Sequence, residues 1–140
     1  MNQSDTPIRC TLFRRLLAVS YDCLLLAGVL FAATAALLPF THGEAIHSGN
    51  YLYLFYLIFC CYLYFGWQWT HGGQTLGMRA WKIRLFTPGF EAIDWHTASK
   101  RFLLAMISWL FAGTGYLWAL FDPDEQTFHD RYSGSALFRV

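Results

Sequence analysis

Three long apolar segments dominate this chain and limit what it can fold into. Each has about the 20 residues that an α-helix, rising about 1.5 Å per residue, needs to cross a bilayer. Only 14% of the 140 residues are charged, against about 25% in typical soluble domains. The pattern predicts an all-α integral membrane protein with two transmembrane helices and a third hydrophobic segment. The apolar segments cover residues 16–38, 51–69 and 102–121.

The residues that flank these segments set the expected boundaries. Residues 1–13 form a polar leader, and residues 14–140 form a single membrane domain. Pro39 ends the first helix, because proline cannot continue the backbone hydrogen-bond ladder. The expected helices cover residues 14–38, 51–69 and 97–121.

The third segment has two alternative courses. Gly113 and Gly115 lie in its middle, and two glycines so close together weaken a helix. The segment is therefore either a single span or a broken helical hairpin with both ends on one side. Residues 81–86 alternate apolar and basic side chains as a strand does, and residues 136–140 form a second strand candidate. We favour the hairpin, because it lets the two strands pair into a small cytoplasmic β ribbon.

Basic residues are distributed unevenly around the apolar segments. The loop over residues 39–50 contains no Lys or Arg. Because basic loops tend to stay in the cytoplasm, we place the N-terminus and residues 68–101 there and the 39–50 loop outside. A net charge of +1 gives no reason to expect nucleic acid as a partner. The basic residues behind this asymmetry are Arg9, Arg14, Arg15, Arg79, Lys82, Arg84, Lys100 and Arg101.

Asp22 interrupts the first apolar segment. A carboxylate near the bilayer centre costs about 2.5–3.5 kcal/mol on insertion scales, so it needs a partner or a function. Arg15 lies on the same helix face about 10.5 Å away, and its side chain points toward the headgroups rather than to Asp22. We expect Asp22 either to fix helix packing or to bind a proton or cation. The expected cationic partners from other segments are Arg79, Lys100, Arg101 and Arg131.

Three motifs together resemble one known family. Residues 13–22 place an arginine at the start of the first helix and an aspartate within it. Residues 73–85 read Gly-x-Thr-x-Gly-x-Arg and continue into a strand, and residues 127–136 contain His-Asp-Arg before a second strand. This order is similar to that of the RDD family, small bacterial membrane proteins named for one arginine and two aspartates. The resemblance covers nearly the whole chain after residue 12.

On that resemblance, the defining polar cluster consists of Arg15, Asp22 and Asp130. The spacing of seven residues to Asp22 selects Arg15 over the adjacent Arg14. The cluster either binds an ion or substrate or holds the helices together. The residues expected to act as its partners are Arg14, Arg79, Arg101, His129 and Arg131.

The resemblance also implies a location and suggests a role. It implies a multi-pass protein of the bacterial inner membrane, with the lipid bilayer as its partner and with a homo-oligomer or a larger membrane partner as further expectations. The suggested role is transport of a cation or small solute, with Asp22 as the intramembrane carboxylate. The alternative is a non-transporting scaffold or accessory subunit in which the cluster is structural.

Several other activities lack the residues they need. The Gly-rich stretch over residues 73–79 has no Lys-Ser/Thr of a phosphate loop, and hydrolase and redox motifs do not occur, so we expect neither an enzyme nor a cofactor. His42, Glu44 and His47 share one loop, but zinc prefers four ligands, or three and a water, so we expect no metal.

Overall fold

The computed structural model describes residues 10–140 apart from positions 48, 88, 90, 112 and 123–125. The described part is mostly helical, with one two-stranded sheet. The elements, in chain order, are α1 (Leu12–Ala35), α2 (Tyr51–Gly72), α3 (Leu76–Ala80), β1 (Ile83–Phe86), α4 (Trp95–Leu110), α5 (Thr114–Leu117), the 3-10 helix η1 (Trp118–Leu120), α6 (Phe128–Ser133) and β2 (Ala136–Arg139).

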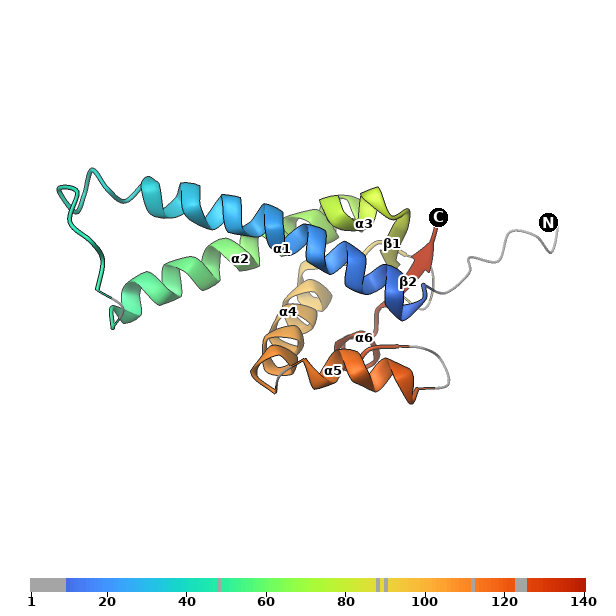
Figure 1. The fold of residues 1–140 in the computed structure, drawn as a ribbon. Helices are drawn as coiled ribbons and strands as arrows, with labels where there is room; N and C mark the ends of the chain where they lie inside the picture. The colour runs from blue at the N-terminus through green and yellow to red at the C-terminus, as the bar shows by residue number, and fades with distance from the viewer. Residues whose placement is uncertain (1–9, 48, 88, 90, 112, 123–125) are drawn as a thin grey trace.

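Helices α1 and α2 form an antiparallel pair joined by the loop over residues 36–50 (Figure 1). Their 24 and 22 residues are long and apolar enough to cross a membrane. Hydrogen bonds near the loop tie them together, from Tyr53 to Thr34 at 2.8 Å and from the Tyr56 hydroxyl to the Ala33 carbonyl at 3.1 Å. The pair therefore provides the two candidate membrane-spanning helices that the sequence predicts.

The ends of these two helices differ slightly from the expected boundaries. Helix α1 ends at Ala35 rather than at residue 38, and turns follow it. Helix α2 continues to Gly72 rather than ending at residue 69, and it stops where Gly73 adopts a left-handed conformation with φ of +63°. Glycine takes this conformation readily, so Gly73 provides the stop.

The third apolar segment is broken. In place of one helix over residues 97–121, α4 ends at Leu110, and the short α5 and η1 follow. Gly113 lies in the break with φ of +74°, a conformation that a continuing helix cannot contain. Asp94 accepts a hydrogen bond from the backbone N–H of Thr97 at 3.0 Å and caps the start of α4. The third segment is therefore a set of broken helical pieces and not one continuous helix.

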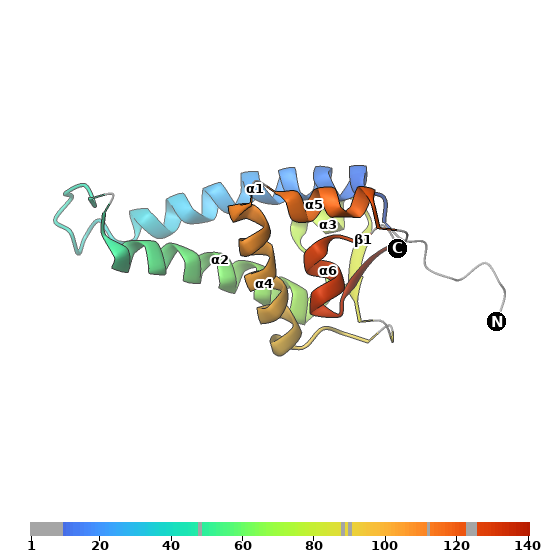
Figure 2. The ribbon, with the colours of Figure 1, turned by 90° about the horizontal axis from the view of Figure 1, so that it is seen from below.

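The two strands pair as the hairpin requires. Strand β1 runs antiparallel to β2, with Ile83 opposite Arg139 and Phe86 opposite Ala136. Helix α4 packs on both α2 and α6. The sheet and α6 lie at the end of the α1–α2 pair that is opposite the 36–50 loop (Figures 1 and 2).

The hydrophobic core lies at this sheet end, where helices, strands and loops meet. Only 11% of the apolar window of either long helix is buried, so most of their apolar surface faces outward. The buried core therefore holds the sheet end together, and it leaves the far half of the α1–α2 pair exposed. Its members are Cys10, Ala18, Trp69, Met78, Ile83, Leu85, Ile93, Ala98, Phe102 and Leu137.

Candidate functional site

Asp130 is fully buried in the first turn of α6 and joins three elements. Its carboxylate accepts hydrogen bonds from Nη1 of Arg15 in α1 and Nη1 of Arg101 in α4. The backbone N–H of Thr127 donates to the same carboxylate at 3.4 Å, so Asp130 also caps α6. Burial disfavours the charged form, but the guanidinium groups of Arg101 and Arg15 outweigh it and hold the pKa of Asp130 well below its usual range. Asp130 is therefore ionised at neutral pH.

The two arginines are themselves fixed by further contacts. Arg15 Nε donates to the carbonyl of Cys10 at 3.0 Å, and Arg101 Nη1 donates to Ser135 Oγ at 2.9 Å. The Arg101 guanidinium also lies over the Trp69 ring, 5.2 Å from its centroid. Within the described part of the chain, Arg101 Nε is buried and has no hydrogen-bond partner. One carboxylate thus holds two buried cations, and one donor of Arg101 is left over.

Asp22 is also buried, but its partners are neutral. It accepts hydrogen bonds from the Thr75 hydroxyl and from the Gly77 backbone N–H, the latter at 2.8 Å. Thr75 is the N-cap of α3 and accepts from the Met78 N–H at 3.1 Å. The carboxylate therefore binds the first turn of α3 and holds it against α1.

The close approach of α3 to α1 depends on a missing side chain at Gly77. A Cβ at this position would overlap the carbonyl oxygen of Ala18 and would lie 2.8 Å from Asp22 Cγ. Only glycine fits here without a shift of one helix. The Gly-x-Thr-x-Gly motif thus supplies both the donors for Asp22 and the space in which they reach it.

This arrangement corrects the expectation of a cationic partner for Asp22. Arg101 binds Asp130 instead, and Arg131 donates to Asp122 at 2.8 Å. Neutral donors bind Asp22 in place of a cation, because α3 brings a hydroxyl and a backbone N–H directly to the carboxylate. The remaining two candidates, Arg79 and Lys100, have exposed side chains.

The expected cluster is therefore divided. The structure brings Arg15 and Asp130 together with Arg101, and it places Asp22 in a separate set of contacts. Arg14 donates to the Trp81 carbonyl at 3.5 Å and takes no part in either set.

His129 lies beside the arginine–aspartate cluster. It is 3% exposed, and its Nε2 is 3.1 Å from Thr127 Oγ1 and 3.9 Å from Asp130 Oδ1. Burial lowers the pKa of His129 to about 4, and Asp130 only partly opposes this. The imidazole is therefore neutral at pH 7 and adds no positive charge.

Thr75 and Gly77 make important contacts that sequence patterns alone do not single out. Both lie in a quoted motif, yet α3 has only five residues, too few for hydrophobic periodicity to predict it. Threonine is a preferred N-cap residue, because its hydroxyl can accept a hydrogen bond from the backbone N–H three residues further along. This signal predicts a helix start but not the acid that the cap contacts.

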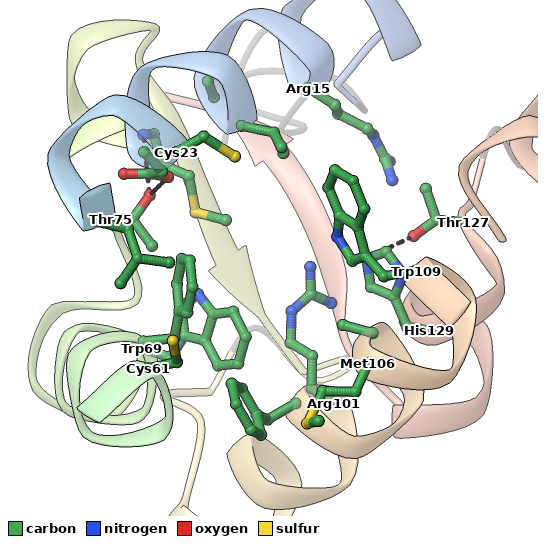
Figure 3. A pocket seen from close by; sticks show the side chains of 18 of the residues that line it. Arg15, Cys23, Cys61, Trp69, Thr75, Arg101, Met106, Trp109, Thr127 and His129 are labelled. Atoms are coloured by element: carbon green, nitrogen blue, oxygen red, sulfur yellow. Dashed lines mark hydrogen bonds between the residues drawn. The ribbon is translucent and has the colours of Figure 1, made fainter. Parts of the chain in front are cut away.

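Both sets of contacts border a single cavity of about 460 Å³ between α1, α2 and α4. Figure 3 shows Arg15 and Arg101 pointing into it from different helices, with Trp69 and His129 on its wall. Among the described residues, no group of three His, Cys, Asp or Glu side chains is placed to hold a metal. Most of the residues that line the cavity are apolar, so the cavity suits a solute that is itself mostly apolar. Its polar and charged lining residues are Arg15, Asp22, Thr75, Arg101, Thr127 and His129.

The fold and the site define a class of protein: a helical protein with two candidate membrane-spanning helices, a small sheet and buried arginine–aspartate contacts. The family model of the RDD family matches residues 9–134, nearly the whole chain. The chain belongs to the RDD family. It has no significant match among curated proteins or among solved structures.

Proposed function

We propose that this protein transports a cation or small solute across the bacterial inner membrane, with a proton or cation bound at Asp22. The observation that carries the proposal is the cavity of about 460 Å³, which borders both candidate spans and includes Asp22 in its wall. Its volume falls within the range of about 300–1,000 Å³ that is common for small-molecule sites. The proposal assigns no catalytic step to any residue.

The exposed surface of α1 and α2 supports a location in the membrane. Leu24, Phe31, Leu52 and Phe55 are each more than two-thirds exposed, which would be unfavourable in water and is favourable in lipid. The uneven distribution of Lys and Arg supports a cytoplasmic N-terminus and an outside 36–50 loop. In this orientation the sheet and α6 lie on the cytoplasmic side.

The contacts of Asp22 support a coupling role. A proton or cation that bound this carboxylate would compete with the Thr75 hydroxyl and the Gly77 N–H. Loss of these two bonds would loosen α3 from α1 and change the wall of the cavity, which both Asp22 and Thr75 line. Ion binding and the shape of the solute site are thereby linked through one side chain.

Flux through proteoliposomes tests the proposal. With pyranine trapped inside, we expect the wild type to move protons faster than empty liposomes when a Na⁺ or K⁺ gradient is applied. Asp22→Asn removes the charge and should abolish this excess. Asp94→Asn is the matched control, because Asp94 is an exposed cap of α4 and asparagine caps a helix equally well. No excess flux in the wild type would overturn ion transport, and equal flux in Asp22→Asn would remove Asp22 from the mechanism.

A second candidate function is a non-transporting scaffold or accessory subunit. The observation that favours it is that each buried acid joins separate elements: Asp22 joins α1 to α3, and Asp130 joins α1, α4 and α6. On this reading Asp22→Asn lowers the melting temperature in detergent, and the wild type shows no flux. Co-purification of one larger membrane protein in a fixed ratio would support the scaffold, whereas a homo-oligomer with flux would support the transporter.

A further inference from the structure

We infer that the cavity between α1, α2 and α4 binds a single-chain amphiphile with a monoanionic head, the head at Arg101 and Arg15 and the chain along the apolar wall. The inference rests on the proposed function, because it names the class of ligand for the same cavity. Three observations carry it: the charge of the arginine cluster, two buried donors without partners among the described residues, and the composition of the wall.

Among the described residues, the arginine cluster carries one unbalanced positive charge. Arg15 and Arg101 each bind Asp130, which is the only acid in contact with either of them within the described residues. His129 is neutral at pH 7. A buried charge without a counter-charge is unfavourable, so a ligand with one negative charge complements this end of the cavity.

Asp22 does not provide that missing charge. It lies seven residues beyond Arg15 on α1, about 10.5 Å along the helix. Its carboxylate is already bound to Thr75 and Gly77. The cavity therefore has a positive end at the arginines and a separate acidic end, whose carboxylate already has two hydrogen-bond donors.

Two buried donors at the positive end have no hydrogen-bond partner in the described part of the molecule. They are Nε of Arg101, which is 2% exposed, and Nε1 of Trp69, which is 5% exposed. Both residues line the cavity, and Figure 3 shows the Arg101 guanidinium pointing into it beside the Trp69 ring. A buried donor without an acceptor is unfavourable, because it has lost its hydrogen bonds to water. Acceptor oxygens of a carboxylate or phosphate head would give these donors a partner.

The rest of the wall favours an apolar chain. Aliphatic and aromatic side chains from three helices surround the space, so a fully polar anion would lose its hydration there without compensation. A chain of medium length would bury its methylene groups against them. Representative wall residues are Val19, Leu26, Ile58, Phe65, Met106 and Leu110.

Binding of decanoate tests the inference. The purified full chain is placed in nanodiscs of phosphatidylcholine, and radiolabelled decanoate is measured by scintillation proximity against empty nanodiscs. Unlabelled decanoate should compete at least about tenfold better than decanol or decyltrimethylammonium, because a charge-assisted hydrogen bond contributes about 1.5–3 kcal/mol. Absence of saturable binding, or equal competition by decanol, would overturn the inference.

Variants locate the site without breaking the ion pairs. Ala105→Phe fills the cavity from α4 and should weaken decanoate binding at least about tenfold, whereas Ala27→Phe, on an exposed position outside the cavity, should leave it unchanged. Trp69→Phe removes Nε1 but keeps the ring and should weaken decanoate and not decanol. Unchanged melting temperatures show that each variant folds. Equal decanoate binding in Ala105→Phe and Ala27→Phe would place the ligand elsewhere and overturn the inference.

One further arm identifies the source of the anion. In nanodiscs that contain phosphatidylglycerol, retained decanoate binding supports a free single-chain amphiphile, whereas loss of decanoate binding would assign the head site to a two-chain bilayer lipid and overturn the single-chain ligand. The result is also separable from the proposed function. Decanoate binding without ion flux would overturn ion transport and support the inferred class of ligand. Ion flux without decanoate binding would overturn only the inferred class of ligand.

Discussion

The two buried acids of this protein are stabilised in opposite ways. Asp130 is bound by two arginines, whereas Asp22 is bound by a hydroxyl and a backbone N–H. The first arrangement needs the acid to be charged, because the arginines cannot lose their protons. The second consists of hydrogen bonds from neutral donors, so a proton or cation that competes with them leaves no buried arginine without its counter-charge. The comparison teaches that Asp130 is suited to a permanent structural role and Asp22 to a role in which its ionisation changes.

Replacement of Asp130 by asparagine should have the largest effect. Asp130→Asn leaves Arg15 and Arg101 buried beside each other without a counter-charge, and removing one partner of a buried ion pair costs about 3–5 kcal/mol. Chemical unfolding followed by circular dichroism measures the loss. A loss below about 1 kcal/mol would show that the arginines do not need the carboxylate and would remove the contrast with Asp22.

The pH dependence of stability should reveal His129 next. Its pKa falls from the ordinary 6.5 to about 4 in the folded protein, so the unfolded chain binds the proton more readily. The stabilisation is present above pH 6.5 and is lost as the pH falls toward 4. At 1.36 kcal/mol per pKa unit this is about 3 kcal/mol. Unfolding curves between pH 7 and 4 should show this loss, and His129→Gln should flatten it; an equal slope in the variant would contradict the assignment.

Gly77→Ala should have the smallest effect of the three, and it tests the Asp22 side of the comparison. The added methyl group forces α3 away from Ala18 and Asp22, and overpacking of this kind costs about 1–3 kcal/mol. Gly28→Ala is the matched control, because its Cβ would meet nothing within 4 Å and alanine favours a helix. Equal melting temperatures for the two variants would mean that the contact between α3 and α1 contributes little.

The sequence predicts well those parts of the fold that have a regular hydrophobic pattern or a glycine at a break. Long apolar runs predict α1 and α2, and Gly113 marks the break in the third segment. Alternation predicts a strand over residues 81–86; the observed strand covers 83–86, because Lys82 has a positive φ of 53° that a strand does not contain. It also selects Arg15 and Asp130, because the family motifs contain them. These features depend on residues that are neighbours in the chain or match a known pattern.

The partners of the two acids are less accessible to such reasoning. Arg101 and Asp130 are 29 residues apart, and Asp22 and Gly77 are 55 apart. Their contacts depend on how α3 and α4 pack, which local periodicity does not describe. The expectation of a cation beside Asp22 assumed that a buried carboxylate needs a charge, whereas two well-placed neutral donors satisfy it.

The long separation between Arg15 and Asp130 has a consequence for biosynthesis. The two residues are 115 positions apart, while Asp22 is only 53 positions from Thr75. As the chain leaves the ribosome, the α1–α3 contact can form while α4 and α6 are still unmade. Arg15 cannot pair with Asp130 until α6 has been synthesised, so until then the nascent chain carries an arginine without that counter-charge near the start of its first helix. Asp130, in the last helix to be synthesised, therefore supplies the counter-charge for an arginine in the first helix.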